Sequence, residues 1–222
     1  MLRHDGEYGG VRMTIRQWLF KPHMPRRLVV LILSVVTMGF CVSIFQQISF
    51  GSDPCAVMTQ GLSRTTGIQY GTCQLLVNLA ACVILLGLKD ITWLGFGSVA
   101  NMVLVGYSKD FFDWVFNCIH PLSGEVMLVK IAVFLPTMAL FLIAVSFYMV
   151  VDLGAAPYDA IPQLLAKRQK KIGFTPLRMA LDIICTVIGY LIGGTVGVVT
   201  VFVCFFMGPV ISAITAKFQR LF

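Results

Sequence analysis

The stretch DLGAAPYDAIPQLLAKRQKK (residues 152–171) decides how this chain folds, because a weaker copy, FGSDPCAVMTQGLSR, stands at residues 50–64. In both copies a long apolar run ends at Gly-x-x-Pro, and a short semi-polar stretch follows. Glycine permits the unusual dihedral angles of a turn that interrupts a helix, and proline fits the first turn of a new helix. The pattern predicts two short helices, 54–66 and 157–170, in a chain that repeats one unit twice.

The composition predicts an all-α polytopic membrane protein. Apolar residues make up 58% of the 222 residues and charged residues only 12%. The charges avoid several segments of about 20 residues, the length that crosses a hydrocarbon core. Six transmembrane helices are expected, close to residues 28–48, 69–88, 91–107, 127–151, 174–192 and 195–215.

Charge and cysteine content exclude several classes of protein. The net charge of +7 does not indicate nucleic-acid binding, because the basic residues lie beside the apolar spans, where they orient a membrane protein. The seven cysteines form no C-x-x-C pair, so we expect no disulfide framework, no metal site and no cofactor. The first apolar run lacks a small-x-small cleavage pattern and is expected to remain as an anchor.

The distribution of Lys and Arg tests the number of spans. With six spans and the N-terminus inside, thirteen of the 17 basic residues lie on the cytoplasmic side and three (Arg64, Lys109 and Lys130) outside, while Arg178 lies within a span. This asymmetry favours cytoplasmic N- and C-termini. The expected units are a basic cytoplasmic arm (1–27), a first three-span repeat (28–107), an outer interfacial linker (108–126), a second repeat (127–215) and a cytoplasmic tail (216–222).

Three spans per half is an odd number, so the two repeats are expected to be inverted relative to each other. Small and polar positions coincide in the same order: Ser43 with Ser146, Gly51 with Gly154, and Gln74 and Asn78 with Arg178 and Asp182. Inverted repeats around a midplane site are typical of secondary transporters. A duplicated protein that senses or scaffolds is the alternative.

Charge within a span is costly, so Arg178 and Asp182 are candidate functional residues. Their spacing of four places them on one helix face, where they could line or gate a cavity, and protonation of Asp182 could couple transport to a proton gradient. A structural ion pair near the cytoplasmic surface is the other interpretation. Gln74 and Asn78 hold the matching positions of the first half without charge.

The helix breaks are candidate binding elements, because helix N-termini attract anions such as a carboxylate. The residues concerned are Gly51, Asp53, Pro54, Gly154, Pro157 and Asp159. Asp53 and Asp159 could instead cap these helices themselves. Asn101 has apolar counterparts in the second half, and its amide could serve the site or bond across helices.

These motifs resemble those of the bacterial YczE/YyaS-type integral membrane proteins and, more distantly, of the YitT group. The second half carries the resemblance best, through Gly154, Pro157, Tyr158, Asp159, Arg178, Gly194, Gly197, Thr200, Gly208 and Pro209. In the first half, Cys55 and Ala56 replace the expected aromatic residue and Asp. The resemblance implies a protein of the bacterial cytoplasmic membrane and supplies no catalytic or substrate residue.

The predicted function is a small secondary transporter of a small organic or anionic solute, working by alternating access with possible proton coupling. The expected site residues are Arg178, Asp182, Gln74, Asn78, Asn101, Ser43 and Ser146, together with the two turns. Expected partners are the lipid bilayer and the solute, and six short spans favour a homodimer. A non-transporting accessory or regulatory protein is the alternative. No constellation of an enzyme is seen.

Overall fold

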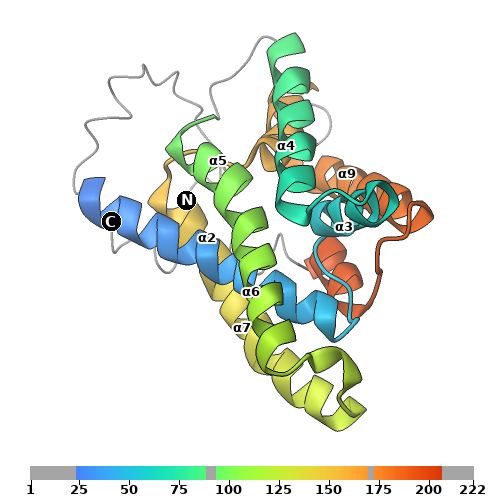
Figure 1. The fold of residues 1–222 in the computed structure, drawn as a ribbon. Helices are drawn as coiled ribbons and strands as arrows, with labels where there is room; N and C mark the ends of the chain where they lie inside the picture. The colour runs from blue at the N-terminus through green and yellow to red at the C-terminus, as the bar shows by residue number, and fades with distance from the viewer. Residues whose placement is uncertain (1–23, 89–93, 170–172, 207–222) are drawn as a thin grey trace, which may run out of the picture.

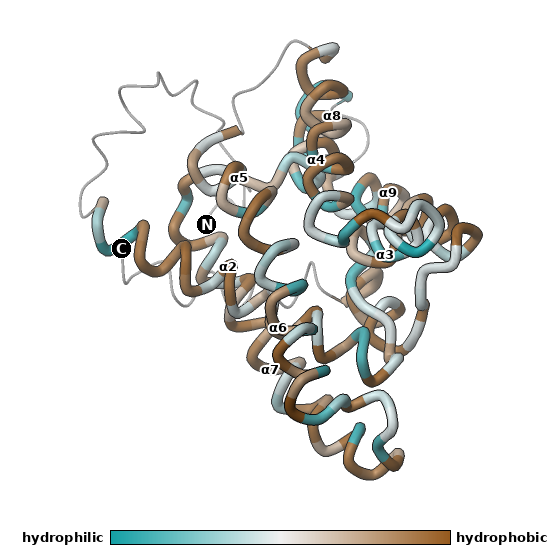
Figure 2. Tube along the Cα trace, viewed as in Figure 1, coloured by the Kyte–Doolittle hydropathy of each residue, from teal (hydrophilic) through white to brown (hydrophobic). Residues whose placement is uncertain are grey.

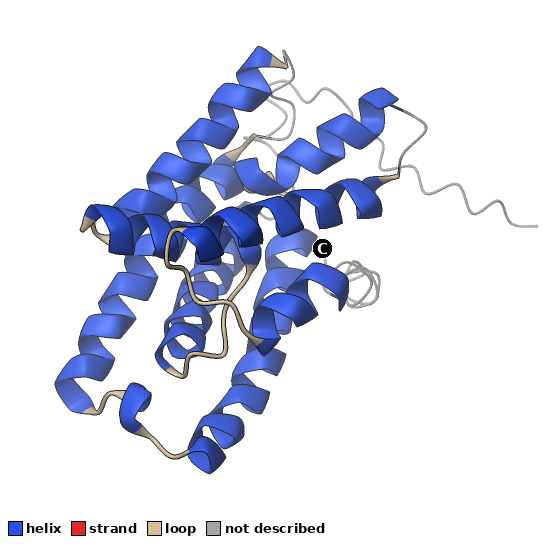
Figure 3. Ribbon diagram, turned by 90° about the vertical axis from the view of Figure 1, so that its right-hand side faces the viewer, coloured by secondary structure: helices blue, strands red, loops and turns tan. Residues whose placement is uncertain are grey.

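The computed structural model describes residues 24–88, 94–169 and 173–206, and every element in these ranges is a helix (Figures 1 and 3). The expected basic arm before residue 24, the tail, and the end of the last span lie outside the described residues. Residues 198–206 are helical up to the end of the described part. The helices are α2 (Met24–Gln47), α3 (Pro54–Thr66), α4 (Tyr70–Gly87), α5 (Phe96–Ala100), the π-helix η1 (Asn101–Val105), α6 (Gly106–Ile119), the 3₁₀ turn η2 (Leu122–Gly124), α7 (Met127–Val151), α8 (Pro157–Gln169) and α9 (Phe174–Leu191).

Four of the described helices, α2, α4, α7 and α9, are long and apolar enough to cross a membrane. Their outward faces carry large apolar side chains, among them Leu79 on α4, Leu135 on α7 and Val187 on α9. Figure 2 shows hydrophobic residues along most of α2 and α7. Such exposed apolar surface suits lipid rather than water. The described part of the chain is thus all-helical, as predicted, and its apolar helices are of the kind found in membrane proteins.

The third expected span is longer than the sequence indicated. Instead of ending near residue 107, the helical path runs through α5, η1 and α6 to Ile119. Three charges in α6 hid this continuation, since Lys109 is only 7% exposed and its Nζ lies 2.6 Å from Asp113 Oδ2 and 3.9 Å from Asp110 Oδ1. Expected among the outer loop charges, Lys109 is instead a buried partner of two carboxylates.

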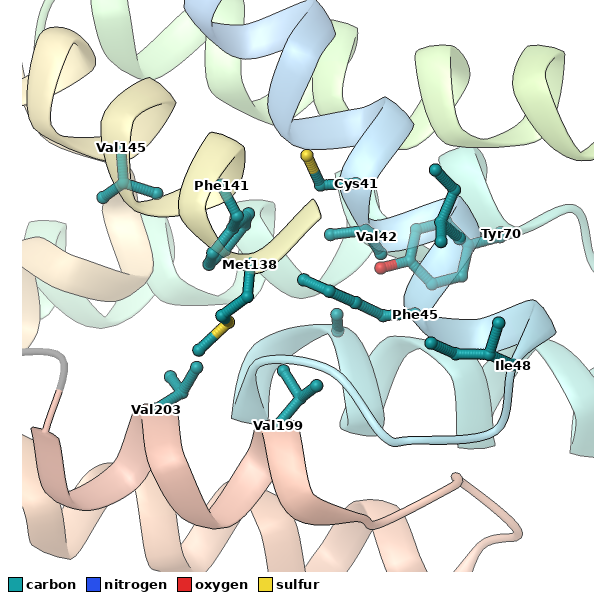
Figure 4. Packing of buried hydrophobic residues seen from close by; sticks show 12 residues of the cluster. Cys41, Val42, Phe45, Ile48, Tyr70, Met138, Phe141, Val145, Val199 and Val203 are labelled. Carbon is teal, nitrogen blue, oxygen red and sulfur yellow. The ribbon is translucent and has the colours of Figure 1, made fainter. Parts of the chain in front are cut away.

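The largest apolar cluster lies between α2 and α7. Phe45 of α2 stacks edge-on against Phe141 of α7, with ring centroids 5.7 Å apart. Val199 and Val203 of the last described helix close the cluster from below (Figure 4). Burying each of these side chains contributes about 1.5–3 kcal/mol where the exposed alternative is water. In lipid, close packing of the same side chains holds the helices together.

The two predicted short helices are present and begin at the two prolines. Gly51 and Gly154 adopt φ angles of +82° and +111°, which side chains with a Cβ rarely adopt. Asp53 then caps α3, since its side chain accepts a hydrogen bond from Ala56 N at 3.1 Å. At its other end α3 stops at Gly67, a left-handed residue whose N–H donates to Ser63 O.

Each helix break is held in place by a hydrogen bond from the other half of the chain. Phe50 O accepts a hydrogen bond from Val199 N at 3.0 Å, and Leu153 O accepts one from Gly97 N at 2.8 Å. The helices pack in the same reciprocal way: α3 of the first half packs on α9 of the second, and α8 of the second half packs on α4 of the first. The first helices of the two halves, α2 and α7, pack on each other. Contacts made by residues 28–107 on the second half thus have counterparts in the opposite direction.

Four hydrogen bonds join helix ends and loops that lie far apart in the sequence. At one pair of ends, Arg27 donates to Val151 O at 2.7 Å, and Arg168 donates to Leu88 O. The other two hydrogen bonds lie at other helix ends: Leu122 N donates to Gln47 Oε1 at 3.1 Å, and Arg64 donates to Gly193 O at 2.9 Å.

Candidate functional site

A cavity of about 70 Å³ lies within the helix bundle and is lined by residues from both halves of the chain. The starts of both short helices reach it, through Pro54 of α3 and Tyr158 of α8. The charged and amide side chains of its lining are all predicted residues: Asp53, Gln74, Asn78, Asn101, Asp159, Arg178 and Asp182.

One arginine organises the second-half side of the cavity. Arg178 Nη1 lies 3.1 Å from Asp159 Oδ1 on α8, and Arg178 Nε lies 3.7 Å from Asp182 Oδ2 one turn along α9. Tyr158 completes the group by donating its hydroxyl hydrogen to Asp182 Oδ1 at 2.6 Å. The predicted pairing of residues 178 and 182 is therefore present, and Asp159 is a second, closer partner of the arginine.

The first-half side of the cavity is polar but uncharged along α4. Gln74 Oε1 accepts a hydrogen bond from Thr59 at 3.0 Å, and Asn78 Nδ2 donates to Gln74 O at 3.0 Å. Asn78 Oδ1 and the Tyr70 hydroxyl have no partner among the described residues, although their side chains are only 1% and 3% exposed. Buried polar atoms of native proteins are nearly always paired, so these two groups indicate water or a ligand in the cavity.

Asn101 reaches the cavity from the first residue of the π-helix η1. Short π-helical segments occur often at functional sites, because one extra residue per turn reorients the side chains around it. Val203, which the repeat pairs with Asn101, lines the cavity too. The lining therefore has an amide on one side and an apolar side chain at the matching position of the other half.

Several predicted residues lie outside the cavity lining. Ser43 donates to Asp113 beside Lys109, and Ser146 bonds back to Leu142 O at 2.7 Å within α7. Gly51, Gly154 and Pro157 lie at the two helix breaks but do not line the cavity. These serines are small polar residues whose hydroxyls are satisfied inside the helix bundle.

Sequence reasoning missed the tyrosines of the site. Tyr70, Tyr148 and Tyr158 all line the cavity. Tyr148 donates its hydroxyl hydrogen to Gly154 O at the second helix break, at 3.2 Å. The available signal was Tyr158 itself, which stands between the conspicuous Pro157 and Asp159, since a buried tyrosine usually finds a partner for its hydroxyl.

The site does not resemble a metal centre. Within residues 24–88, 94–169 and 173–206, no three His, Cys, Asp or Glu side chains come together closely enough to hold an ion. Two of the three aspartates at the cavity, Asp159 and Asp182, contact the same arginine, Arg178. A polar cavity of this kind can bind and orient a small solute.

Comparison with known proteins places nearly the whole bundle in one family. An uncharacterized protein of Haemophilus influenzae is 24% identical over 171 residues, which cover 77% of this chain and 75% of the relative. No solved structure matches the chain. The family model spans residues 25–216, from the start of α2 past the last described helix. The chain therefore belongs to a family of unknown function, DUF6198.

Proposed function

We propose that this protein is a small secondary transporter that moves a small organic solute by alternating access. In this proposal six spans form two inverted three-span repeats in the bacterial cytoplasmic membrane, and both chain ends lie in the cytoplasm. The resemblance to the YczE/YyaS-type proteins belongs to the same proposal. The observation that carries it is the buried polar cavity, which takes its walls from both halves and from both helix breaks.

The exchanged packing supports the inverted repeat. Each short helix packs on the third helix of the opposite half, α3 on α9 and α8 on α4. The matching backbone bonds to Phe50 O and Leu153 O are related in the same way. A pseudo-twofold axis in the membrane plane produces such reciprocal pairs, and rocking of one half against the other then opens the cavity to alternate sides.

The contacts between helix ends support the proposed orientation. The charge distribution puts Arg27, Val151, Leu88 and Arg168 at the cytoplasmic ends of their segments, and these four residues are joined in two pairs. It puts the loops holding Leu122 and Gly193 outside, and they bond to Gln47 and Arg64, which lie at outer ends. None of these four hydrogen bonds joins an end assigned to the cytoplasmic side with an end assigned to the outer side.

A solute without negative charge fits the site better than an anion. The N-terminus of α3 is already capped by Asp53, and Asp159 stands in the first turn of α8. The positive ends of both short helices thus face carboxylates of the protein itself. An incoming anion would meet these charges before it met a free N–H group.

Proton coupling is part of the proposal and rests on Asp182, which is 1% exposed. The charged and titratable groups around it are Arg178 on its own helix, Tyr158 and Asp159 on α8, Asp53 before α3, and the nearby thiols of Cys55 and Cys185. Protonation of Asp182 would remove one of the two carboxylates that hold Arg178. The arginine would then pair with Asp159 alone, which changes the contact between α8 and α9.

Uptake into proteoliposomes tests the proposal. Vesicles holding the purified protein should accumulate at least one member of a panel of small organic solutes when a pH gradient is imposed, and empty vesicles should not. Asp182→Asn keeps the acceptor for Tyr158 but cannot ionise, so uptake should fall at least tenfold. Glu125→Gln is the matched control, because Glu125 pairs with His120 in the loop before α7 and should leave uptake unchanged. A folded protein without uptake across the panel would favour the accessory role.

A further inference from the structure

We propose that the cavity selects a small monovalent organic cation of the alkylammonium type. This inference rests on the proposed function only for the idea that the bound cation is also transported, because binding can be measured without transport. Three independent features carry it: the charge balance of the lining, two unpartnered polar atoms, and an aromatic wall.

The charge balance of the lining is negative. Asp53, Asp159 and Asp182 face the cavity with one arginine, Arg178, which leaves two negative charges among the described lining residues. The N-termini of α3 and α8 each add about +0.5 charge. The sum is close to −1, which one monovalent cation neutralises. Leaving this charge uncompensated in a low-dielectric interior would be costly.

One of the unpartnered atoms requires a hydrogen-bond donor from the ligand. Asn78 Oδ1 is an acceptor, because the amide nitrogen of the same side chain already donates to Gln74 O. The Tyr70 hydroxyl, also without a partner among the described residues, can donate or accept. A primary alkylammonium group offers N–H donors, and a carboxylate offers none. Asn78 Oδ1 therefore matches an alkylammonium ion that carries N–H groups.

The remaining wall is aromatic and soft. Phe141, Tyr148 and Tyr158 line the cavity with Met38 and Met149. The hydroxyls of the two tyrosines are held by Gly154 O and Asp182, so their rings stay in place as fixed walls. Aromatic rings attract alkylated ammonium ions and do little for a strongly hydrated metal ion.

Another ring of the cavity lining, Tyr70, already contacts a cation of the protein. The ammonium group of Lys109 lies over this ring, 4.3 Å from its centroid. Lys109 itself is not among the cavity-lining residues.

The size of the cavity limits the solute. Its volume of about 70 Å³ is several times the roughly 15 Å³ that one water molecule requires, which suits a solute of about two to five non-hydrogen atoms. Methylammonium and tetramethylammonium span this range.

Calorimetric titration of the detergent-purified full chain tests the inference. The probes are methylammonium and tetramethylammonium, with tert-butanol as the neutral analogue of similar size, acetate as the anion, and sodium as the inorganic cation. Tetramethylammonium should bind at least tenfold more tightly than each of the last three. Equal binding of tert-butanol or sodium, or preferred binding of acetate, would overturn the inference.

Two variants locate the binding in the cavity. Asp53→Asn keeps a good N-cap for α3 while removing one charge, so tetramethylammonium should bind roughly tenfold more weakly in a protein that still folds. Asn78→Leu removes the unpartnered acceptor at similar volume and should weaken methylammonium more than tetramethylammonium, which has no N–H. Glu125→Gln should change neither. Unchanged affinity in both cavity variants would place the cation elsewhere and defeat the inference.

Binding and flux separate the two proposals. Cation binding without uptake in proteoliposomes would keep this inference and remove the transporter. Uptake of a neutral or anionic solute, with no cation binding, would keep the transporter and remove the cation.

Discussion

At the scale of single residues, the backbone crossings leave no room for side chains. A Cβ on Gly197 would overlap the carbonyl of Phe50, and one on Gly97 would overlap the carbonyl of Gly154. The overlapped atoms are backbone, so the neighbours cannot turn aside. Small residues at such crossings are what allow helices to approach closely in lipid.

Gly197→Ala should therefore destabilise the protein by about 1–3 kcal/mol or more, because the added methyl group overpacks a backbone contact. Gly87→Ala is the matched control, since a Cβ there would meet open space within a helix. Thermal unfolding of the purified variants in detergent measures the difference. Equal melting temperatures for the two variants would show that the crossing is looser than described.

Single-residue reasoning from the sequence found most of the charged site. The spacing of Arg178 and Asp182 was sufficient to place them on one face, and the Gly-x-x-Pro turns gave the starts of α3 and α8. The bond between Arg178 and Asp159 could not be predicted, because it joins two helices whose separation in space is set by the fold. Spacing along a chain reports on one element only.

At the scale of elements, α6 is anchored by a second ionic group. Lys109 bridges Asp113 and Asp110, while Asp110 accepts a hydrogen bond from Gly71 N of α4 at 2.7 Å and Asp113 accepts one from Ser43 of α2. Three helices are thereby joined at one place. The sequence suggested an outer interfacial linker here, because buried charges that neutralise each other cannot be told from surface charges by composition.

Lys109→Met should leave the two carboxylates without their cation and lower stability by roughly 3–5 kcal/mol. Adding Asp113→Leu to the same chain should recover part of the loss, since replacing both members of a buried pair by apolar groups is often neutral. Thermal unfolding of both variants gives the comparison. A double variant no more stable than the single one would argue that the group is not a coupled pair.

At the scale of the whole molecule, the proposed orientation makes a prediction that no single contact does. Cys118 is exposed near the end of α6, which the proposal places outside. A membrane-impermeant maleimide should label it in intact cells. Lys167→Cys, made in a Cys118→Ser background, should be labelled only after the membrane is permeabilised, because α8 ends on the cytoplasmic side. Labelling of both positions from one side would falsify the inverted arrangement.

The composition could predict the helical class and the Gly-x-x-Pro motif the two short helices, but neither could predict how the two halves meet. The apolar runs give spans, and Lys and Arg give sides. Where α3 and α8 pack on the opposite half, the carbonyl oxygens of Phe50 and Leu153 accept hydrogen bonds from that half, and such backbone contacts cannot be read from the residue types. The same is true of the π-helix η1, which no residue pattern announces.

The reciprocal bonds to Phe50 O and Leu153 O have a consequence for how the chain can be divided. Each half supplies the donor that satisfies the other's carbonyl, so a solitary half would lose both this hydrogen bond and the helix surface that it packs on. Two fragments cut between α6 and α7 should therefore be mutually dependent: coexpression should rescue them, and either one alone should be degraded.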